Sequence, residues 1–504
     1  HACGIVITKD PVDTYVPLYV RDNQISTQYI MTTLEELGLL KMDFLGLRTL
    51  TVIKDTIDLV KQNRGIDVEF DKDMADPKVY KLWQEGKTCG IFQFESQGMT
   101  NFMKELKPDC LEDLIAGVSL YRPGPMDQIP RYIKGKLHPG HNEYTHPRLE
   151  PILNVTYGCM VYQEQVMQIV RDLAGYSLGR ADLVRRAMGK KKLDVMAKER
   201  EIFINGQVDE NGNIIVPGCV RNGIDKESAN KIFDEMAEFA KYAFNKSHAA
   251  CYAVVAYRTA YLKAYYPAEF MAATLNSFLG NLDKIPQYID ECKLLGIEIL
   301  KPDINKSSSK FTVENIDGGQ KIGKIRFGLG SIKNVGLVPI ANIIKERNEN
   351  GKFKGFTDFC ERIAEEAVNK KCVESLIKAG AFQEFPENRA TLLVSFETII
   401  DTIQSSKKKG LDGQVSMFDI GNKEDEEKNN KIKYTYYNQQ EFTEKELLSM
   451  EKEMLGIYVS GHPLEKLRNQ IEHETNINTK QIKEIDEEMS KEEQTEKLQF
   501  KDGQ

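Results

Sequence analysis

The sequence predicts a multidomain protein of the α+β class in which helices predominate. Its length of 504 residues suggests about three or four domains. Near the start, apolar segments of strand character at Gly4–Thr8 and Leu39–Phe44 flank a short capped helix near Thr33–Glu36, which indicates a mixed α/β region. Amphipathic helical patterns then dominate residues 48–278, and a smaller unit of mixed type covers residues 290–400.

The composition excludes several classes of protein. Hydrophobic residues make up 41% and charged residues 29% of the chain, so it is not disordered throughout. No apolar run reaches the length of a membrane span. The start, HACGIVI, lacks the basic segment of a secretory signal and reads as a piece cut from a longer protein. The nine cysteines never form a C-x-x-C pair, so we expect reduced thiols in a cytoplasm rather than zinc ligands or disulfides.

The charge is unevenly distributed along the chain. The formal net charge is −8, but residues 421–504 alone hold 20 acidic and 13 basic side chains. The rest of the chain is therefore nearly neutral, and within it residues 180–200 hold 8 basic and 3 acidic side chains. A local basic cluster on a neutral body favours a site for phosphate groups.

The first candidate site is the second apolar segment, LKMDFLGL. If it is a strand, Lys41 and Asp43 point to the same face. A carboxylate among so many apolar neighbours is costly unless it is paired or binds a metal. A lysine beside a metal-binding aspartate suits phosphoryl transfer to a nucleotide, because the cation meets the triphosphate while the carboxylate holds Mg²⁺. The alternative is that Asp43 caps a helix over Phe44–Leu50.

Loops and a hairpin divide the helical region. Long amphipathic stretches predict helices at Gln163–Leu173, Lys226–Phe244 and Ala249–Tyr266. The segment Tyr121–Met126 holds two prolines and a glycine, which exclude a helix there. Residues Val208–Pro217 predict a hairpin.

The basic cluster forms the second candidate site, RADLVRRAMGKKK. On a helix, Asp182 lies three and four residues before Arg185 and Arg186, so it can orient both guanidinium groups. Three lysines follow from Lys190 onwards. Charge runs are usually solvated helix ends, but two arginines capable of bidentate contact in an otherwise apolar helix favour a phosphate site.

The third candidate site is the segment AFNKSHAACY. Asn245 or Ser247 can cap the helix that begins near Ala249, whose N-terminal N–H groups attract anions. Lys246 and His248 beside this terminus suit a phosphate or a base edge. A simple capping turn is the alternative.

The smaller mixed unit supplies the fourth candidate site. It carries predicted helices at Leu337–Glu349 and Val373–Ala379. Before them, Arg326–Gly336 contains a Gly-x-Gly turn that opens a short helix. Such a turn offers backbone N–H groups, together with Lys333, to one phosphate of a nucleic-acid strand, whatever its base sequence.

The C-terminal part combines breaks with a docking segment. The run Ser405–Gly410 is expected to end the helical periodicity, and residues 421–440 have the composition of a mobile linker before a helix at Glu441–Leu455. The segment QVSMFDI has no core of its own to enter, so it is typical of a peptide that docks an apolar pair in another protein's pocket. An ordinary loop with two buried anchors is the alternative.

Taken together, these segments resemble the alpha subunit of bacterial DNA polymerase III, the C-family replicative polymerase. The resemblance extends from His1 to about Leu464 and rests on ten phrases in the expected order: KMDFLGLRTLT, IFQFES, YRPGPM, VYQEQVMQI, RRAMGKKK, FNKSHAACYA, YPAEFMAA, FGLGSIKNVG, QVSMFD and GHPL.

The resemblance implies a domain organisation. The expected parts are the distal part of a polymerase-β-like palm (1–47), mostly α-helical fingers (48–290), a clamp-binding domain (291–425) with a helix-hairpin-helix at about 326–336 and a clamp peptide at 414–419, and a charged linker approaching an OB domain that this chain does not contain (426–504).

The resemblance also assigns roles to single residues. Asp43 matches a metal-binding, catalytic carboxylate of the palm, with Mg²⁺ as the expected cofactor. The residues expected to bind the incoming nucleotide are Lys41, Arg185, Arg186, Lys190, Lys246 and His248. Those expected to bind DNA are Arg122, Gly328, Gly330, Lys333 and Gly336. Those expected to bind the sliding clamp are Gln414, Met417 and Phe418, with Met417 where other clamp peptides often have Leu.

The implied activity is that of a DNA-directed DNA polymerase, a nucleotidyltransferase that adds deoxynucleotides to a primer 3′-hydroxyl by a two-metal mechanism. The family's paired metal-binding aspartates, in a Pro-Asp-Phe-Asp-x-Asp type of stretch, have no counterpart in this chain. Asp43 alone cannot hold two ions about 3.5 to 4 Å apart, so we expect the isolated chain to be inactive.

Two other functions are compatible with the residues. One is a non-catalytic module that binds DNA and the sliding clamp. The other is a nucleotide-dependent metabolic enzyme, which would show negligible, salt-insensitive affinity for DNA.

The expected partners follow from the resemblance. They are primer-template DNA, deoxynucleoside triphosphates, the sliding clamp (beta), and the clamp-loader and proofreading exonuclease subunits of the holoenzyme. We expect a cytoplasmic location and no membrane partner.

Overall fold

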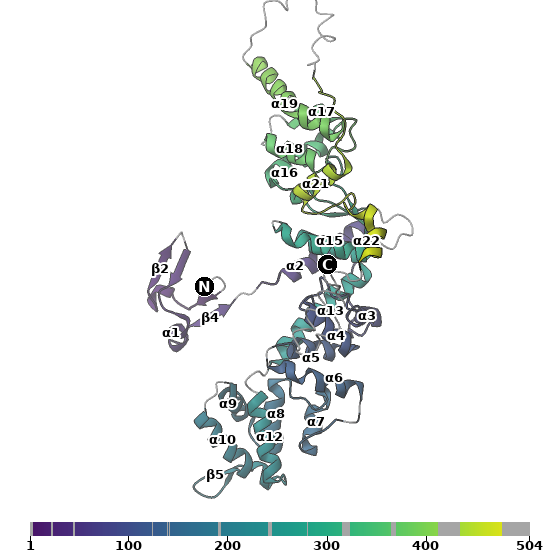
Figure 1. Cartoon of the computed structure of the whole chain (residues 1–504). Coiled ribbons are helices and arrows are strands. Elements are labelled where there is room, and N and C mark those ends of the chain that lie inside the picture. The colour runs from purple at the N-terminus through teal and green to yellow at the C-terminus, as the bar shows by residue number, and fades with distance from the viewer. Residues whose placement is uncertain are drawn as a thin grey trace, which may run out of the picture. The chain divides into compact units, whose positions relative to one another are not determined.

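The computed structural model describes most of the chain, which separates into two compact units, His1–Tyr266 and Pro267–Gln504 (Figure 1). Both units are mainly helical and carry only small sheets, so the expectation of a multidomain chain with predominant helices is confirmed. The described residues are 4–21, 24–43, 46–122, 124–138, 140, 142–189, 193–239, 244–279, 281–314, 323–363, 369–411 and 434–475.

The N-terminal region is a pair of two-stranded antiparallel ribbons with one short helix. Its elements are β1 (Gly4–Ile7), β2 (Leu18–Arg21), β3 (Gln24–Thr27), α1 (Met31–Glu36) and β4 (Leu40–Asp43). Strand β1 pairs with β4, with Val6 opposite Lys41 and Gly4 opposite Asp43. Both predicted strands and the short helix are confirmed, but the predicted cap is wrong, because the helix begins at Met31 after Ile30, which makes no side-chain capping bond. The capping alternative for Asp43 is wrong, because the next helix begins at Arg48.

One face of the β1–β4 ribbon is apolar and exposed. Ile5 lies opposite Met42, and Ile7 lies opposite Leu40. All four side chains are exposed to solvent, although strands alternate their side chains between two faces. A two-stranded ribbon is marginal by itself in water, so such a face needs a further layer to cover it.

Helices dominate the rest of the first unit. They are α2 (Arg48–Arg64), α3 (Pro77–Gln84), α4 (Gln97–Leu106), α5 (Leu111–Leu120), α6 (Ile129–Leu137), α7 (Glu150–Leu153), α8 (Gln163–Ala174), α9 (Leu178–Gly189), α10 (Leu193–Asn205), α11 (Gly218–Arg221), α12 (Lys226–Phe239) and α13 (Lys246–Tyr265), with short 3₁₀ turns at Pro125–Gln128, Pro147–Leu149 and Asn154–Thr156. The predicted hairpin is present as β5 (Gln207–Val208) and β6 (Ile214–Val216).

Helix α13 is central to the core of this unit. Its buried alanines, at positions 249, 253, 256 and 260, follow the spacing of one helix face. Small side chains let the backbone approach α5, which is buried from Asp113 to Leu120. The N-terminal ends of α8 and α13 meet, since Tyr162 and Phe244 form a parallel bridge. That junction positions the candidate site described below.

The second unit is a helical body around a three-stranded sheet. Its elements are α14 (Pro267–Asn276), a 3₁₀ turn at Leu282–Lys284, α15 (Ile285–Leu294), β7 (Ile299–Leu300), β8 (Thr312–Glu314), β9 (Lys324–Arg326), a 3₁₀ turn at Leu329–Ser331, α16 (Leu337–Asn350), α17 (Phe356–Ile363), α18 (Lys370–Lys378), α19 (Arg389–Leu411), α21 (Glu444–Leu455), a 3₁₀ turn at Glu465–Leu467 and α22 (Arg468–Glu474). In the sheet, β9 is central, parallel to β7 and antiparallel to β8.

Helix α19 is longer than the sequence predicts. The run Ser405–Gly410, expected to end the periodicity, lies inside the helix. The hydroxyl of Ser405 donates to the helix carbonyls of Asp401 and Thr402, so this polar residue is accommodated without a break. Lysine is a good helix former, and its run continues the helix to Leu411.

The segment that begins at residue 434 packs on α19 instead of running free. Composition predicts a mobile linker over residues 421–440, but the amides of Tyr437 and Gln439 donate to the hydroxyls of Ser395 and Thr391, at 2.8 and 3.0 Å. These two side chains are buried on α19 and give the extended backbone its partners. The difference arises because composition carries no information about hydrogen-bond partners elsewhere in the chain.

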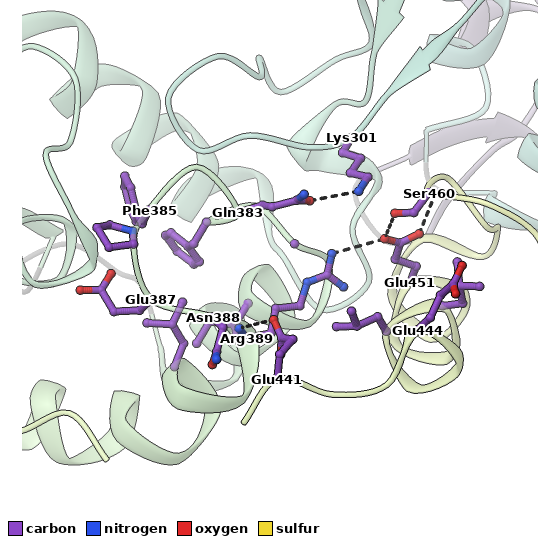
Figure 2. A pocket seen from close by; sticks show the side chains of 17 residues that line it. Lys301, Gln383, Phe385, Glu387, Asn388, Arg389, Glu441, Glu444, Glu451 and Ser460 are labelled. Carbon is purple, nitrogen blue, oxygen red and sulfur yellow. Dashed lines mark hydrogen bonds and ion pairs between the residues drawn. The ribbon is translucent and has the colours of Figure 1, made fainter. Parts of the chain in front are cut away.

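A cavity of about 330 Å³ lies beside the start of α19. Figure 2 shows the ion pair at its wall, in which Arg389 lies 3.3 Å from the carboxylate of Glu451 on α21. Glu451 is buried and also accepts from the amides of Val459 and Ser460, at 3.3 and 3.0 Å. The cavity therefore marks the place where the C-terminal segment is fastened to this unit.

The described part of the chain contains no helix that combines the length and the apolar character needed to cross a bilayer. No disulfide joins the cysteines among the described residues, and five of these eight thiols are buried.

Candidate functional site

One carboxylate on α9 holds the two arginines that the sequence singles out. Asp182 Oδ1 accepts from Arg185 Nε and Nη2, at 3.0 and 2.7 Å. Asp182 Oδ2 lies 2.8 Å from Arg186 Nε. The predicted orientation of both guanidinium groups by Asp182 is therefore confirmed. The hydrogen bond from Arg185 is the main reason that the pKa of Asp182 is lowered, so this carboxylate stays ionised at neutral pH.

Arg185 has a third contact, which reaches another helix. Its Nη1 donates to Oε1 of Gln163, at the start of α8, over 2.8 Å. A guanidinium group has five N–H donors, and these contacts use its Nε–H and at least one N–H on each terminal nitrogen. The contacts thus leave one N–H on each terminal nitrogen for an anion such as phosphate.

The N-terminus of α13 already has an anion of the protein's own. Asn245 caps it, since Asn245 Oδ1 accepts from the amide of His248 at 2.9 Å, whereas Ser247 lies inside the helix. The amide of Lys246 donates to both carboxylate oxygens of Glu164, at 3.2 and 3.1 Å. The sequence predicted that this helix end attracts an external anion. Instead, the carboxylate of Glu164, which belongs to the protein itself, binds there.

The side chain of Lys246 is also held from the protein side. Its Nζ lies 3.0 Å from Oε2 of Glu112 and 5.1 Å from the centre of the Tyr162 ring. The side chain is only partly exposed. A phosphate would therefore have to share this ammonium group with Glu112.

Arg122 and His248 belong to a stack of rings at the same junction. The guanidinium carbon of Arg122 lies 4.0 Å from the centre of the Phe244 ring. The ring of His248 stands 5.4 Å from Phe244 and 4.3 Å from Tyr252, on the next turn of α13. Arg122 and His248 are both exposed, so the stack presents a cation and an imidazole to solvent.

The structure thus brings together five of the residues that the sequence assigns to nucleotide or DNA: Arg122, Arg185, Arg186, Lys246 and His248. Lys190 lies outside the described residues. Lys41 and Asp43 belong to the N-terminal ribbon, where both lie in β4 two residues apart. The side chain of Asp43 lies outside the described part of the chain.

Sequence reasoning missed Gln163 and Glu164, which tie the arginine helix to α13. Both lie in the phrase VYQEQVMQI, whose helix was recognised but whose polar residues were given no role. The available signal was a Gln–Glu pair in the first turn of an otherwise amphipathic helix. Such a pair faces the approaching chain instead of the core.

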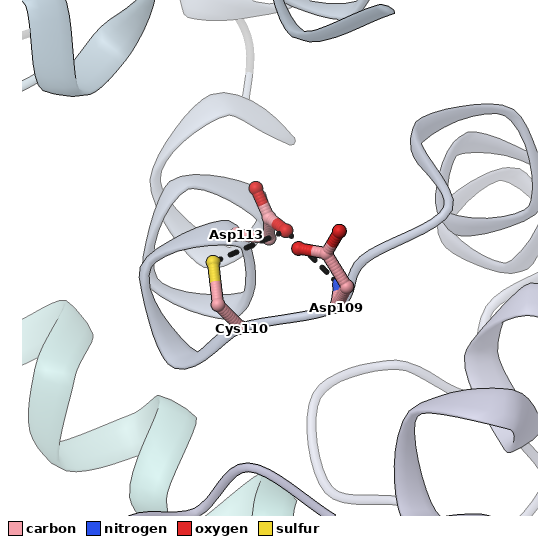
Figure 3. A group of neighbouring side chains, drawn as sticks. All are labelled: Asp109, Cys110 and Asp113. Atoms are coloured by element: carbon pink, nitrogen blue, oxygen red, sulfur yellow. Dashed lines mark hydrogen bonds between the residues drawn. The ribbon is translucent and has the colours of Figure 1, made fainter. Parts of the chain in front are cut away.

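A cluster of possible metal ligands proves to be a structural ion pair. The ligand atoms of Asp109, Cys110 and Asp113 lie within 4.8 Å of one another, and Figure 3 shows all three at the start of α5. Nζ of Lys136 contacts both carboxylates and lies 3.1 Å from Asp109 Oδ1. Burial raises the pKa of the Cys110 thiol to about 11, so it is protonated at neutral pH. The protein's own ammonium group fills this site.

In the second unit, the glycines of the Gly-x-Gly turn are needed for close backbone packing. A Cβ on Gly330 would lie 2.6 Å from the carbonyl oxygen of Ser309, and one on Gly328 would lie 2.5 Å from the backbone of Lys310. Moreover, the amides of Leu329 and Gly330 donate to the carbonyls of residues 308 and 309, each over 2.9 Å. These two donors serve the fold, which corrects the expectation that this turn offers them to a phosphate.

The residues that follow the turn remain accessible. Lys333 is exposed, and its amide donates to the carbonyl of Met454 over 2.9 Å. Asn334 adopts a left-handed backbone with φ of 64°, after which Gly336 precedes the first turn of α16. An exposed lysine beside the N-terminus of a 14-residue helix is an arrangement that favours a phosphate group. The clamp-peptide residues Gln414, Met417 and Phe418 lie outside the described residues.

Comparison with protein families assigns three segments of the chain. Residues 49–211 match the bacterial DNA polymerase III alpha subunit finger domain, and residues 296–392 match a helix-hairpin-helix motif. Residues 1–46 match the bacterial DNA polymerase III alpha NTPase domain. The three matches follow the chain in order and include the arginine helix and the Gly-x-Gly turn.

Curated relatives named DNA polymerase III subunit alpha are similar over nearly the whole chain. The protein of Borreliella burgdorferi is 44% identical over 95% of this chain, and that of Thermus aquaticus is 45% identical over 92%. The protein of Bacillus subtilis is 42% identical over 94%. The chain spans 40%, 36% and 40% of these three relatives, respectively. It belongs to the family of bacterial DNA polymerase III alpha subunits and covers about two-fifths of a member's length.

Proposed function

We propose that this chain is the fingers-containing part of the catalytic subunit of a bacterial replicative DNA polymerase, and that Arg185 and Arg186 bind the triphosphate of the incoming deoxynucleotide. The observation that carries the proposal is that one carboxylate, Asp182, fixes both guanidinium groups. Arginines that are fixed in this way and still have N–H donors left favour phosphate oxygens in a way that a mobile surface charge does not.

In this proposal the chain contributes binding and charge to the reaction. The primer 3′-hydroxyl attacks the α-phosphorus of the nucleotide, and pyrophosphate leaves. Arg185 and Arg186 orient the triphosphate and neutralise the charge that develops on the departing pyrophosphate. Lys41 is proposed to act on the same triphosphate from the palm side.

Magnesium chemistry needs more carboxylates than this chain is known to bring together. We propose Asp43 as one ligand of Mg²⁺, as the family resemblance implies. Among the described residues, the possible metal-ligand group is Asp109, Cys110 and Asp113, and Lys136 fills it. Two-metal catalysis requires several carboxylates around both ions, so the described residues do not form such a site.

DNA binding is proposed for the second unit and for Arg122. Lys333 and the N-terminus of α16 support contact with one phosphate of the duplex backbone, which positions DNA without reading its sequence. The match to a helix-hairpin-helix motif over residues 296–392 supports the same role. We further propose that Lys190, Lys246 and His248 assist at the nucleotide.

Holoenzyme partners are proposed from the resemblance. Gln414, Met417 and Phe418 would dock in a pocket of the sliding clamp, which raises the effective concentration of polymerase at the primer end. Replacing Met417 and Phe418 by Ala in the intact enzyme should abolish clamp-dependent processivity and leave distributive synthesis intact. The clamp-loader and proofreading subunits are proposed as further partners.

The nucleotide role of Arg185 can be tested in a full-length subunit that contains this chain. Arg185→Ala should raise the KM for deoxynucleotides about tenfold to hundredfold in primer extension, because hydrogen bonds to a charged group are lost. The matched control is Arg171→Ala, since Arg171 is a surface arginine on α8 that pairs with its neighbour Asp172. If only the affinity for DNA changed in the first variant, the proposed role would be wrong.

A non-catalytic module for DNA and clamp binding remains the second candidate for the 504-residue chain by itself. What favours it is the absence, among the described residues, of a carboxylate group able to hold two metal ions. We expect this chain to bind primer-template DNA but not to extend it. Robust Mg²⁺-dependent incorporation by the purified chain would refute this second proposal.

A further inference from the structure

Gln163 links the arginine helix to the rest of the junction. Its side-chain oxygen accepts from Arg185 over 2.8 Å, and its backbone amide donates to the carbonyl of Phe244 over 2.9 Å. The ring of Phe244 in turn lies under Arg122. A single residue therefore connects α9, the start of α8 and the segment that leads into α13.

Its neighbour Glu164 completes this connection on the other side. The carboxylate accepts from the amide of Lys246 and so fastens the start of α8 to the start of α13. The two contacts made by Gln163 and Glu164 span 22 and 82 residues of sequence, respectively. The dipeptide is thus a fixed point relative to which Arg185 and Lys246 are placed.

We propose that Gln163 is a positioning residue of the nucleotide site, which holds the Arg185 guanidinium in place for the triphosphate. This inference rests on the proposed function of Arg185. Gln163 acts through the arginine and does not itself touch the nucleotide.

Asp182 cannot supply this positioning alone. It lies on the same helix as Arg185, three residues away, so the pair moves as α9 moves. The Gln163 contact comes from a different helix and fixes the guanidinium relative to the body of the unit. A displacement of a binding group by about 1 Å lowers the rate by as much as a hundredfold. The second contact, from Gln163 to Arg185, therefore matters for function.

The contact is also chemically suited to its task. A neutral amide oxygen accepts a hydrogen bond from the guanidinium without adding a second negative charge beside Asp182. The cluster of Asp182, Arg185 and Arg186 therefore keeps a net positive charge for the triphosphate. The contact lies in a partly buried place, where Arg185 is 23% exposed, so water competes poorly for it.

The test uses a full-length subunit that contains this chain, in primer extension with varied deoxynucleotide. Gln163→Met keeps the length of the side chain and removes the acceptor. We expect the KM for nucleotide to rise about tenfold, the cost of one hydrogen bond to a charged group, with kcat within about twofold. Gln168→Met, the same change at an exposed position of α8, should stay within about twofold of wild type.

The double variant separates positioning from a merely structural role. If Gln163 acts through Arg185, adding Gln163→Met to Arg185→Ala should change KM by less than about twofold, because the two effects are not additive. Effects that multiply would overturn the inference. An unchanged KM in Gln163→Met, beside a raised KM in Arg185→Ala, would also overturn it while leaving the proposed function intact.

Two further outcomes have a defined meaning. If Arg185→Ala itself leaves KM unchanged, the proposed function fails and this inference fails with it. If Gln163→Met does not fold, Gln163→Asn replaces it, since the shorter amide withdraws the acceptor from Arg185 and keeps a polar side chain. That variant should raise KM in the same way, and an unchanged KM would overturn the inference.

Discussion

At the scale of single residues, Asp113 shows how a buried carboxylate depends on one cation. Its side chain is 1% exposed, and it contacts Nζ of Lys136, which is 11% exposed. The amide of Asp109 and the thiol of Cys110 also donate to it, at 3.1 and 3.4 Å. A buried charge whose partner is removed is strongly destabilising, because its desolvation is no longer offset.

We therefore expect Lys136→Met to destabilise the first unit by about 3 to 5 kcal/mol, measured as a shift in its urea unfolding transition. Lys134→Met, at an exposed position of the same helix, should cost less than about 0.5 kcal/mol. Adding Asp113→Asn to Lys136→Met should recover part of the loss, because no buried charge is left unpaired. An unfolding transition of Lys136→Met equal to that of wild type would contradict this account.

The second carboxylate that contacts Lys136, that of Asp109, predicts a dependence on pH. Burial alone would raise the pKa of Asp109, but the hydrogen bond and charge of Lys136 lower it below its usual value. Because the pKa is lower in the folded state, the stabilisation is present above the ordinary pKa of about 3.9 and is lost as the pH falls through the folded value. The stability difference between wild type and Lys136→Met should therefore shrink below about pH 4.

At the scale of elements, the start of α19 is held by residues far along the chain. Both carboxylate oxygens of Glu441 accept from backbone amides in the first turn of α19. The amides are those of Arg389 and Ala390, at 3.0 and 3.1 Å. A carboxylate at a helix N-terminus satisfies donors that have no partner inside the helix and interacts well with the helix dipole. The C-terminal segment thus supplies part of the cap of α19, beside Asn388, whose Oδ1 accepts from the amide of Thr391 at 2.8 Å.

Replacing Glu441 by Ala should lower the free energy that holds the C-terminal segment on α19 by about 1 kcal/mol, the usual contribution of a helix cap. Hydrogen exchange at the amides of Tyr437 and Gln439 should then accelerate by about fivefold. Glu444→Ala is the matched control, since Glu444 pairs with Lys466 at an exposed position and should have little effect. Equal exchange in the two variants would show that Glu441 does not fasten the segment.

At the scale of the whole molecule, the proposed binding of DNA would have to work against the overall charge. The chain carries a formal net charge of −8, so the proposal requires local groups such as Lys333 to supply the affinity for a polyanion. Each phosphate neutralised by a cation releases condensed counterions, which makes binding steeply dependent on salt. A metabolic enzyme that binds only a small phosphorylated substrate would not show this dependence of DNA binding on salt.

We expect the 504-residue chain to bind duplex DNA with a steep salt dependence, and Lys333→Ala to lower the slope of log K against log salt by about one. Lys345→Ala changes an exposed lysine further along α16 and serves as the control for general loss of charge. Binding that is weak and insensitive to salt would favour the metabolic-enzyme alternative. The measurement is a fluorescence titration over a range of salt concentrations.

Much of the fold could be predicted because it depends on local patterns. Periodicity located the strand that carries Asp43, the hairpin near residue 210 and the main helices, and i to i+3 and i+4 spacing predicted that Asp182 orients its arginines. The family resemblance located the segments in order. The periodicity and spacing signals each lie within one or two helix turns or one strand, where residues close in sequence are also close in space.

The parts that escaped prediction depend on partners distant in sequence. The helix end near Lys246 looked open to an anion, but Glu164 occupies it from 82 residues away. The amides of the Gly-x-Gly turn looked available, but the carbonyls of residues 308 and 309 accept from two of them. Residues 434–440 looked like a linker, but buried hydroxyls on α19 pair with their backbone.

The sequence by itself determined the family and the order of the elements, and it pointed to the cations that are proposed to meet phosphates. Only the tertiary structure decided which donors and acceptors remain available, because a hydrogen-bonding group is satisfied by whatever the fold brings beside it. That is why the two arginines were foreseeable from their spacing, whereas the glutamine that anchors one of them became visible only when α8, α9 and α13 were seen together.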